Sequence, residues 1–170
     1  DCSEKSLLMF RKALEPAIAE AAADNITDSQ LRELERALLR IEKAEHNPKA
    51  RARADADFHL ALAKASGNPL FVTVYLALYV RLLDWVERSA TVAMDQNAAL
   101  IYQGQIVTND RVGLSTHRGI YEAIKARDLI TAKARAEEHA RFAEVALRFL
   151  REQNDQPVAQ SESVTAVCPT

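Results

Sequence analysis

The scarcity of helix-breaking residues is the feature that most restricts the fold of this chain. Of its 170 residues only 4 are glycine and 5 are proline, whereas 30 are alanine. Alanine is the best helix former, and glycine and proline interrupt helices most often. No segment alternates between polar and apolar residues for long enough to build a sheet. The composition therefore predicts an all-α fold, and 48% hydrophobic residues are enough for the core of one domain.

Apolar residues recur at helical spacing in six segments, and turn signals separate the segments. Thr27 and Gln30 match a capping box at the start of the second segment. Ser66-Gly67-Asn68-Pro69 marks a turn between the third and the fourth. We predict an antiparallel bundle of about six helices, with a loop or frayed turn at 90–108. The expected helices cover about 7–23, 28–45, 49–65, 69–89, 109–126 and 128–152.

The ends of the chain differ from this helical part in composition. Residues 1–6 are polar and are expected to be the end of a linker, before a helical domain at 7–152. Residues 153–170 are rich in Gln, Ser and Pro and predict a disordered tail. Nothing near the start has the order of charged, apolar and small residues that marks a signal peptide, so we expect a cytoplasmic protein.

Charge and hydropathy exclude two classes of partner at this stage. The 22 basic and 24 acidic residues give a net charge of -2, which argues against a generally basic surface for nucleic acid. No uninterrupted apolar run approaches the roughly 18 residues of a membrane span, so we expect no membrane contact.

Several polar residues lie on the apolar faces of the predicted helices. Asp55 and His59 are one turn apart on the third helix, so their side chains can converge on one point. His117 lies on the apolar stripe of the fifth helix, and His139 lies among alanines on the sixth. Burying such groups without partners costs free energy, so each needs an explanation.

A divalent metal ion would account for all four residues. Neutral imidazoles and carboxylates bind zinc, nickel and manganese, and facing helices of a bundle often assemble such sites. Core histidines are also commonly satisfied by ordinary hydrogen bonds, with Asp55 and His59 forming a simple helix pair. The spacing alone leaves both interpretations open.

Two arginines also interrupt apolar stripes. Arg11 lies on the first helix and Arg81 on the fourth, and a guanidinium facing an apolar pocket can bind a carboxylate with two hydrogen bonds. Arg11 can instead pair with Glu15. Arg81 can pair with Asp84 or extend to water.

A series of short motifs points to a known family. The motifs are Arg-Lys-Ala-Leu-Glu-Pro at 11–16, Asp-Ala-Asp-Phe-His at 55–59, Ala-Ser-Gly-Asn at 65–68, His117 with Ile120, Ala123 and Ile124, and then Asp128, Ala132 and His139. In this order they resemble the effector-binding domain (FCD fold) of the FadR branch of GntR-type transcription regulators, over about 7–150. Six helices are closer to its VanR-like subgroup than to the subgroup with an extra helix.

The resemblance implies a metal site inside the bundle. In many members of the family, an Asp, a His one turn later and two further His bind a divalent metal. Those positions are filled here by Asp55, His59, His117 and His139. Asp57 is two residues from His59 and is expected to point to another face.

The resemblance also implies a role in sensing and not in catalysis. We expect a small carboxylate effector near the metal, with Arg11 or Arg81 beside it, and a homodimer. In this family a winged-helix domain carries the DNA-binding function, and residues 1–6 are too few to form it. DNA is therefore expected as a partner only through a domain outside this chain. Two alternatives are a metal-dependent, hydrolase-like helical enzyme, which lacks a placed general base, and a metal-free interaction module.

Overall fold

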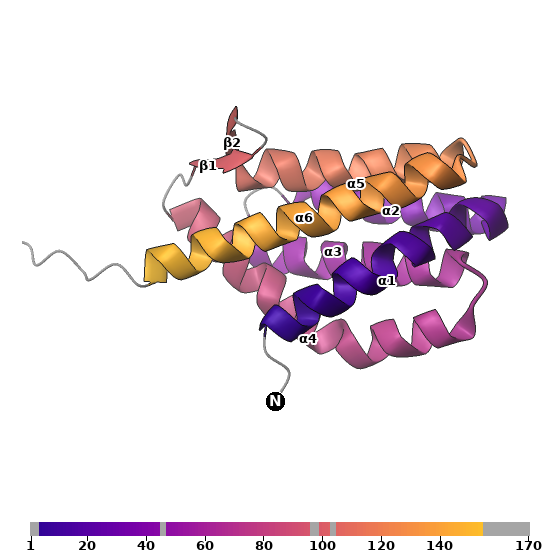
Figure 1. Ribbon diagram of the computed structural model, residues 1–170, viewed down its shortest axis with the longest axis horizontal. Helices are drawn as coiled ribbons and strands as arrows, with labels where there is room; N and C mark the ends of the chain where they lie inside the picture. The colour runs from indigo at the N-terminus through magenta and orange to yellow at the C-terminus, as the bar shows by residue number, and fades with distance from the viewer. Residues whose placement is uncertain (1–3, 45–46, 96–98, 103–104, 155–170) are drawn as a thin grey trace, which may run out of the picture.

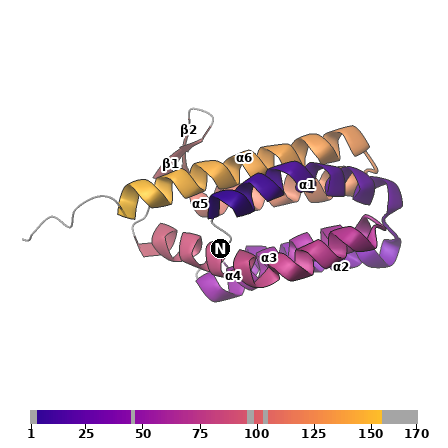
Figure 2. The ribbon, with the colours of Figure 1, turned by 60° about the horizontal axis from the view of Figure 1, so that its bottom comes forward.

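In the computed structural model, the described part of the chain forms six helices that pack in two layers. One layer contains α1, α6 and α5, and the other contains α4, α3 and α2 (Figures 1 and 2). The layers meet through contacts of α1 with α3 and of α2 with α5. This arrangement confirms the predicted all-α bundle. The elements are α1 (Glu4–Asn25), α2 (Asp28–Lys43), α3 (Pro48–Ala65), α4 (Pro69–Asp95), β1 (Ala99–Tyr102), β2 (Gln105–Thr108), α5 (Asn109–Lys125) and α6 (Leu129–Asn154).

The structure describes the backbone of residues 4–44, 47–95, 99–102 and 105–154, and the side chains of 4–44, 47–91 and 113–145. Within this part, α1 begins at Glu4, so residues 4–6 are helical and not the expected linker. Helix α6 continues to Asn154, so residues 153 and 154 are helical and not part of the expected tail. The rest of the predicted tail, 155–170, lies outside the described residues and stays a prediction.

A short antiparallel hairpin stands where a loop or frayed turn was expected. Strands β1 and β2 pair with Ala99 opposite Thr108 and Tyr102 opposite Gln105. The hairpin lies at the N-terminal end of α5 and beside α6 (Figure 1). Each strand has four residues, which is too short for a sequence alternation to be distinguished from a loop.

Local capping fixes where the helices begin and end. The hydroxyl of Thr27 accepts a hydrogen bond from the backbone of Gln30, and the Gln30 side chain accepts one from Thr27 N, which confirms the capping box. Asp128 accepts one from the backbone N–H of Thr131 at the start of α6. Gly67 turns the chain after α3 with φ +74°, a conformation that a Cβ atom would disfavour.

Small residues allow the helices to approach closely around the core. Ala19, Ala22, Ala132 and Ala136 are buried on α1 and α6, which pack against each other. Larger side chains such as Phe58 fill the space between the layers, and burying one of them stabilises the fold by about 1.5–3 kcal/mol. The buried polar cluster described below lies inside this packed bundle.

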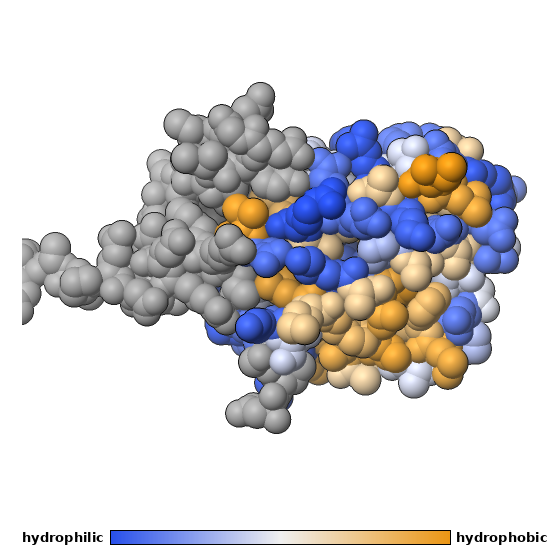
Figure 3. All heavy atoms as spheres, viewed as in Figure 1, coloured by the Kyte–Doolittle hydropathy of each residue, from blue (hydrophilic) through white to orange (hydrophobic). Residues whose placement is uncertain are grey.

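Helix α4 is the most apolar element and lies at the edge of its layer. By length and composition alone it is long and apolar enough to cross a membrane, which the count of uninterrupted apolar residues did not indicate. Its inner face carries Tyr75, Leu82 and Trp85 in the core, as expected for a bundle helix. Its outer face leaves Leu76 and Val80 exposed, and apolar side chains gather over α4 in Figure 3.

Candidate metal and effector site

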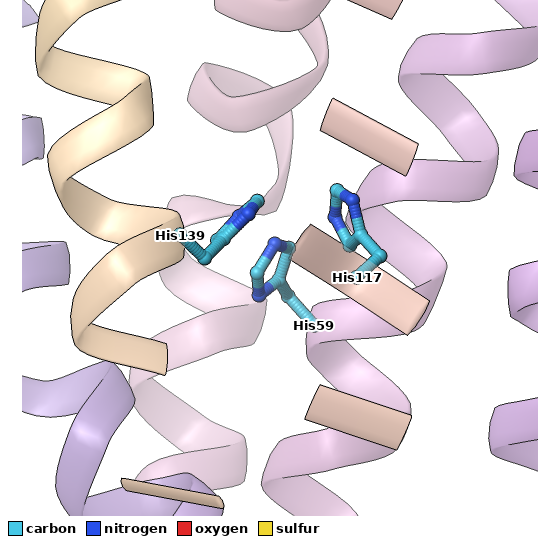
Figure 4. Close-up of side chains that lie close together, drawn as sticks. All are labelled: His59, His117 and His139. Atoms are coloured by element: carbon cyan, nitrogen blue, oxygen red, sulfur yellow. The ribbon is translucent and has the colours of Figure 1, made fainter. Parts of the chain in front are cut away.

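Three helices bring three imidazoles to one point inside the bundle. His59 comes from α3, His117 from α5 and His139 from α6 (Figure 4), and one ring nitrogen of each lies within 4.8 Å of the others. Asp55 lies one turn before His59, with Oδ1 3.1 Å from His117 Nε2 and Oδ2 3.8 Å from His59 Nε2. The structure therefore brings together all four residues that the sequence analysis selected as ligands.

The hydrogen bond of His117 fixes which of its nitrogens faces the cluster. Its Nδ1 lies 2.6 Å from the carbonyl oxygen of Gly113, one turn earlier on α5. A carbonyl oxygen can only accept, so Nδ1 carries the proton. In the neutral ring, Nε2 then presents a lone pair toward His59 and His139.

The same reasoning applies to His139. Nη2 of Arg11 lies 2.9 Å from His139 Nε2, and because a guanidinium has no acceptor, Nε2 must accept. The proton is therefore on Nδ1, which lies 2.9 Å from Oγ1 of Thr116. The Thr116 hydroxyl in turn donates to the carbonyl of Gly113 at 2.9 Å.

His59 completes the set with a carboxylate behind it. Its Nε2 accepts from Arg11 Nη2 at 3.0 Å, which leaves the proton on Nδ1, 3.5 Å from Oε1 of Glu15. All three rings therefore direct Nε2 inward, and His117 and His139 each have a hydrogen-bond partner at Nδ1, whereas Nδ1 of His59 has none among the described residues. Such outer partners orient the histidine ligands of metal sites.

Arg11 and Glu15 form a buried ion pair beside the histidines. Nε of Arg11 lies 2.5 Å from Oε1 of Glu15, and the hydroxyl of Tyr75 donates to the same oxygen at 2.8 Å. Both charged side chains are 1% exposed. The guanidinium carbon also lies 5.3 Å from the ring centroid of Trp85, within range of a cation–π contact.

Burial and charge set the protonation of the cluster. Burial lowers the pKa of His59 to about 4 and holds the pKa of His139 well below its usual value. Burial alone would raise the pKa of Asp55 and of Glu15, but the facing imidazoles and the Arg11 guanidinium outweigh it and lower both. At neutral pH the cluster therefore has neutral His59 and His139 and ionised carboxylates.

The donor and acceptor balance of the cluster fits a bound cation. Oδ1 of Asp55 lies 3.1 Å from Nε2 of His117, and in the neutral ring both atoms are acceptors. Asp55 Oδ2 and His117 Nε2 are buried and have no hydrogen-bond partner among the described residues. Because buried polar atoms are almost always paired, a cluster of imidazole lone pairs and a carboxylate is suited to a divalent metal.

A small cavity of about 60 Å³ opens next to the cluster. Arg51 lies on its wall and is 8% exposed, so the cavity has a second buried guanidinium besides Arg11. The indole nitrogen of Trp85, also on the wall, is buried without a hydrogen-bond partner in the part of the chain that is described. The lining residues are Arg11, Arg51, Asp55, Trp85, Val86, Ser89, Ala90, Gly113, His117, His139, Phe142 and Ala143.

The predicted position of Arg81 on the apolar face of the fourth helix was wrong. Arg81 is exposed, whereas its neighbour Leu82 is fully buried. The sequence analysis put Arg81 on a stripe between Leu78 and Trp85, but α4 is apolar on most sides, so its inner face could not be identified from the pattern. Asp57 points away from the cluster as expected and accepts a hydrogen bond from Tyr79.

Some residues of the site were not found from the sequence. Thr116 bonds to His139 on another helix, and Gly113 acts through its backbone carbonyl, so neither residue leaves a periodic signal. Arg51 did leave a periodic signal, because it precedes Asp55 by four residues and His59 by eight. This spacing places all three residues on one face of α3.

Comparisons with known proteins identify the family. The family model of the FCD domain matches residues 6–142, and the chain belongs to this family. The chain is 31% identical over 119 residues to the HTH-type transcriptional repressor NanR of Escherichia coli K12, and to that of Shigella flexneri. The match covers 70% of this chain but 41% of each repressor, so the chain spans less than half of their length.

Solved structures give the same result. A GntR protein of Streptococcus agalactiae is 29% identical with a TM-score of 0.58, covering 80% of this chain and 55% of that chain. The fold also resembles E. coli McbR/YncC, at 18% identity, a TM-score of 0.63, and 91% and 68% coverage. The predicted likeness to the effector-binding FCD domain of GntR-type regulators is therefore confirmed.

Proposed function

We propose that this domain senses a small carboxylate with the help of a divalent metal, as part of a transcription regulator. One observation carries the proposal: three imidazole Nε2 atoms and a carboxylate face one point beside a cavity with two buried guanidinium groups. His59, His117, His139 and Asp55 would hold the metal. When bound, the metal supplies a Lewis acid that attracts an anionic oxygen. Zinc, nickel and manganese all suit these ligands, because availability as well as affinity selects the metal.

The proposed binding of a carboxylate effector rests on Arg11 and Arg51. Both are buried at the cavity, and guanidinium groups bind carboxylates through parallel hydrogen bonds. The cavity of about 60 Å³ restricts the effector to a few non-hydrogen atoms unless a side chain moves. The indole N–H of Trp85 is in place to donate to a further oxygen of the effector.

The proposed parent protein is a cytoplasmic homodimer that binds DNA through a winged-helix domain. The likeness to HTH-type repressors supports this proposal. The chain of the proposed parent protein would contain residues that this sequence does not include. Effector binding alters DNA binding only if the effector prefers one arrangement of the dimer. The six helices support the VanR-like subgroup.

The exposed apolar residues on the outer face of α4 support a dimer interface on this face. Leu76 is 56% exposed and Val80 is 72% exposed, and the exposed Thr73 and Ala77 lie on the same side of the helix. Exposed apolar patches of this kind mark interaction sites. A second copy of the chain would cover this face in the proposed dimer.

Catalysis has less support. The carboxylates near the histidines, Asp55 and Glu15, are both engaged with imidazoles or Arg11 in the described part of the chain. Glu138 pairs instead with Arg135 on the surface of α6. A hydrolase would need a general base placed beside the site, so we propose a binding function.

The proposal is tested by thermal shift with zinc and a panel of lactate, pyruvate and succinate. We expect at least one of these acids to raise the melting temperature in the presence of zinc and not after chelation. The Arg51→Met variant should lose this shift, whereas the matched exposed variant Arg81→Met should keep it. A shift that is unchanged by chelation and by Arg51→Met would contradict the proposal, and so would the absence of a shift for all three acids.

A further inference from the structure

Arg11 contacts the same two nitrogen atoms that a metal at this site would need. Its Nη2 lies 3.0 Å from Nε2 of His59 and 2.9 Å from Nε2 of His139. A neutral imidazole has one lone pair on this nitrogen, so the nitrogen either accepts from Arg11 or binds a metal. The observed position of Arg11 and full coordination by both histidines are therefore mutually exclusive.

We propose that Arg11 is a built-in competitor of the metal, and that metal binding frees its guanidinium to bind the carboxylate effector. This inference rests on the proposed function, because it takes the three histidines as the metal ligands. It adds an order of binding: metal first, effector second.

Electrostatics favours the same conclusion. Arg11 is a buried cation in contact with two candidate ligands, and its pKa is far above the physiological range, so it stays charged. A second cation at the cluster is repelled by this charge, and the low dielectric of the core strengthens the repulsion. Removing the charge of Arg11 should therefore strengthen metal binding.

The ion pair with Glu15 holds Arg11 near the cavity. Trp85 also lines the cavity, and its ring lies 5.3 Å from the guanidinium carbon when Arg11 contacts the histidines. Once the imidazole nitrogens no longer accept from Nη2, the N–H groups of Nη2 lose these two acceptors, while Nε stays paired with Glu15. A carboxylate in the cavity supplies two acceptors of the right charge, so metal and carboxylate bind with positive coupling.

Two readouts test the proposal with zinc alone as the probe. The first is the zinc dissociation constant, from competition with a chromogenic chelator, for the wild-type protein, Arg11→Met and the exposed control Arg40→Met. We expect Arg11→Met to bind zinc at least tenfold more tightly, and Arg40→Met to match the wild type.

The second readout is the fluorescence of Trp85, the single tryptophan of the chain. Zinc should change it in the wild type, because Arg11 moves relative to the ring, and should change it much less in Arg11→Met.

A second pair of variants guards against misfolding, because Arg11→Met leaves Glu15 buried without its cation. Glu15→Gln and the double variant Arg11→Met/Glu15→Gln differ only at Arg11, and the double variant should bind zinc more tightly. Equal zinc affinities within both pairs, with unchanged Trp85 fluorescence, would overturn the inference while leaving the metal site intact. If neither the wild type nor any variant binds zinc, the metal part of the proposed function fails.

Discussion

Oδ1 of Asp55 lies 3.1 Å from Nε2 of His117, and neither atom can donate a hydrogen bond while His117 is neutral. With a neutral ring, two buried acceptors face each other here, and a cation bound to both atoms would satisfy them. The folded protein nevertheless favours the ionised carboxylate, because the facing imidazoles and Arg11 lower the pKa of Asp55. The contact is therefore suited to share one bound cation.

The Asp55→Asn variant tests this interpretation. The amide N–H₂ of asparagine can donate to a neutral His117 Nε2, but the variant loses the buried carboxylate charge that Arg11 stabilises. We expect zinc affinity to fall, because an amide is a weaker ligand than a carboxylate. Competition with a chromogenic chelator gives this quantity. A zinc affinity equal to that of the wild type would contradict the account.

Thr116→Val removes the hydroxyl that holds His139 Nδ1 and hardly changes the side-chain volume. We expect zinc affinity to fall by about 10- to 100-fold, the usual effect of removing an outer hydrogen bond to a metal ligand. Chelator competition measures it. Thr73→Val is the matched control, because the exposed Thr73 hydroxyl donates to the carbonyl of Pro69 on its own helix. Equal zinc affinities for the two variants would show that Thr116 does not orient His139.

The stability of the metal-free protein should fall as the pH is lowered from about 6.5 to about 4. In this range the unfolded chain protonates His59, whereas the buried ring stays neutral because its pKa is lowered to about 4. Protons therefore bind preferentially to the unfolded chain, and one such histidine changes stability by about 1.4 kcal/mol per pH unit. His139 acts in the same direction.

Urea midpoints of the chelated protein between pH 7 and pH 5 measure this dependence of stability on pH. The slope of stability against pH should be smaller in His59→Gln. A slope that His59→Gln leaves unchanged would contradict the assignment.

Val80→Asp should convert the proposed dimer into a monomer. The charge would lie in the middle of the apolar face of α4, where its burial against a second copy is costly. Sedimentation equilibrium gives the mass. Ile130→Asp is the control, because Ile130 is 83% exposed but lies on α6. A dimer that survives Val80→Asp, or one broken equally by Ile130→Asp, would place the interface elsewhere.

The sequence predicted the parts of the fold that depend on local chemistry. The turn at Gly67 and the caps at Thr27 and Asp128 are short-range features, and all three are present in the structure. Histidines on otherwise apolar faces were also informative, because a buried polar residue stands out against its neighbours. This is why His59, His117 and His139 were selected correctly as members of one cluster.

The sequence did not predict features that arise between helices. Arg81 was placed inward because α4 has apolar residues on nearly every side, and only its packing on α3 defines the buried face. The contact of Arg11 with both His59 and His139 joins residues 48 and 128 positions apart, and no local pattern encodes it. The pair of Arg11 with Glu15 was considered from its spacing, and the structure shows that it forms beside the histidines.

Elemental analysis of the purified, untagged protein tests the central claim most directly. The protein is purified without chelator, and metal per chain is measured for the wild type, His117→Ala and His139→Ala. The account predicts about one equivalent of a divalent metal in the wild type and its loss in both variants, because residues from separate helices hold one ion. A wild-type protein that stays metal-free after incubation with zinc, nickel and manganese in turn would contradict it.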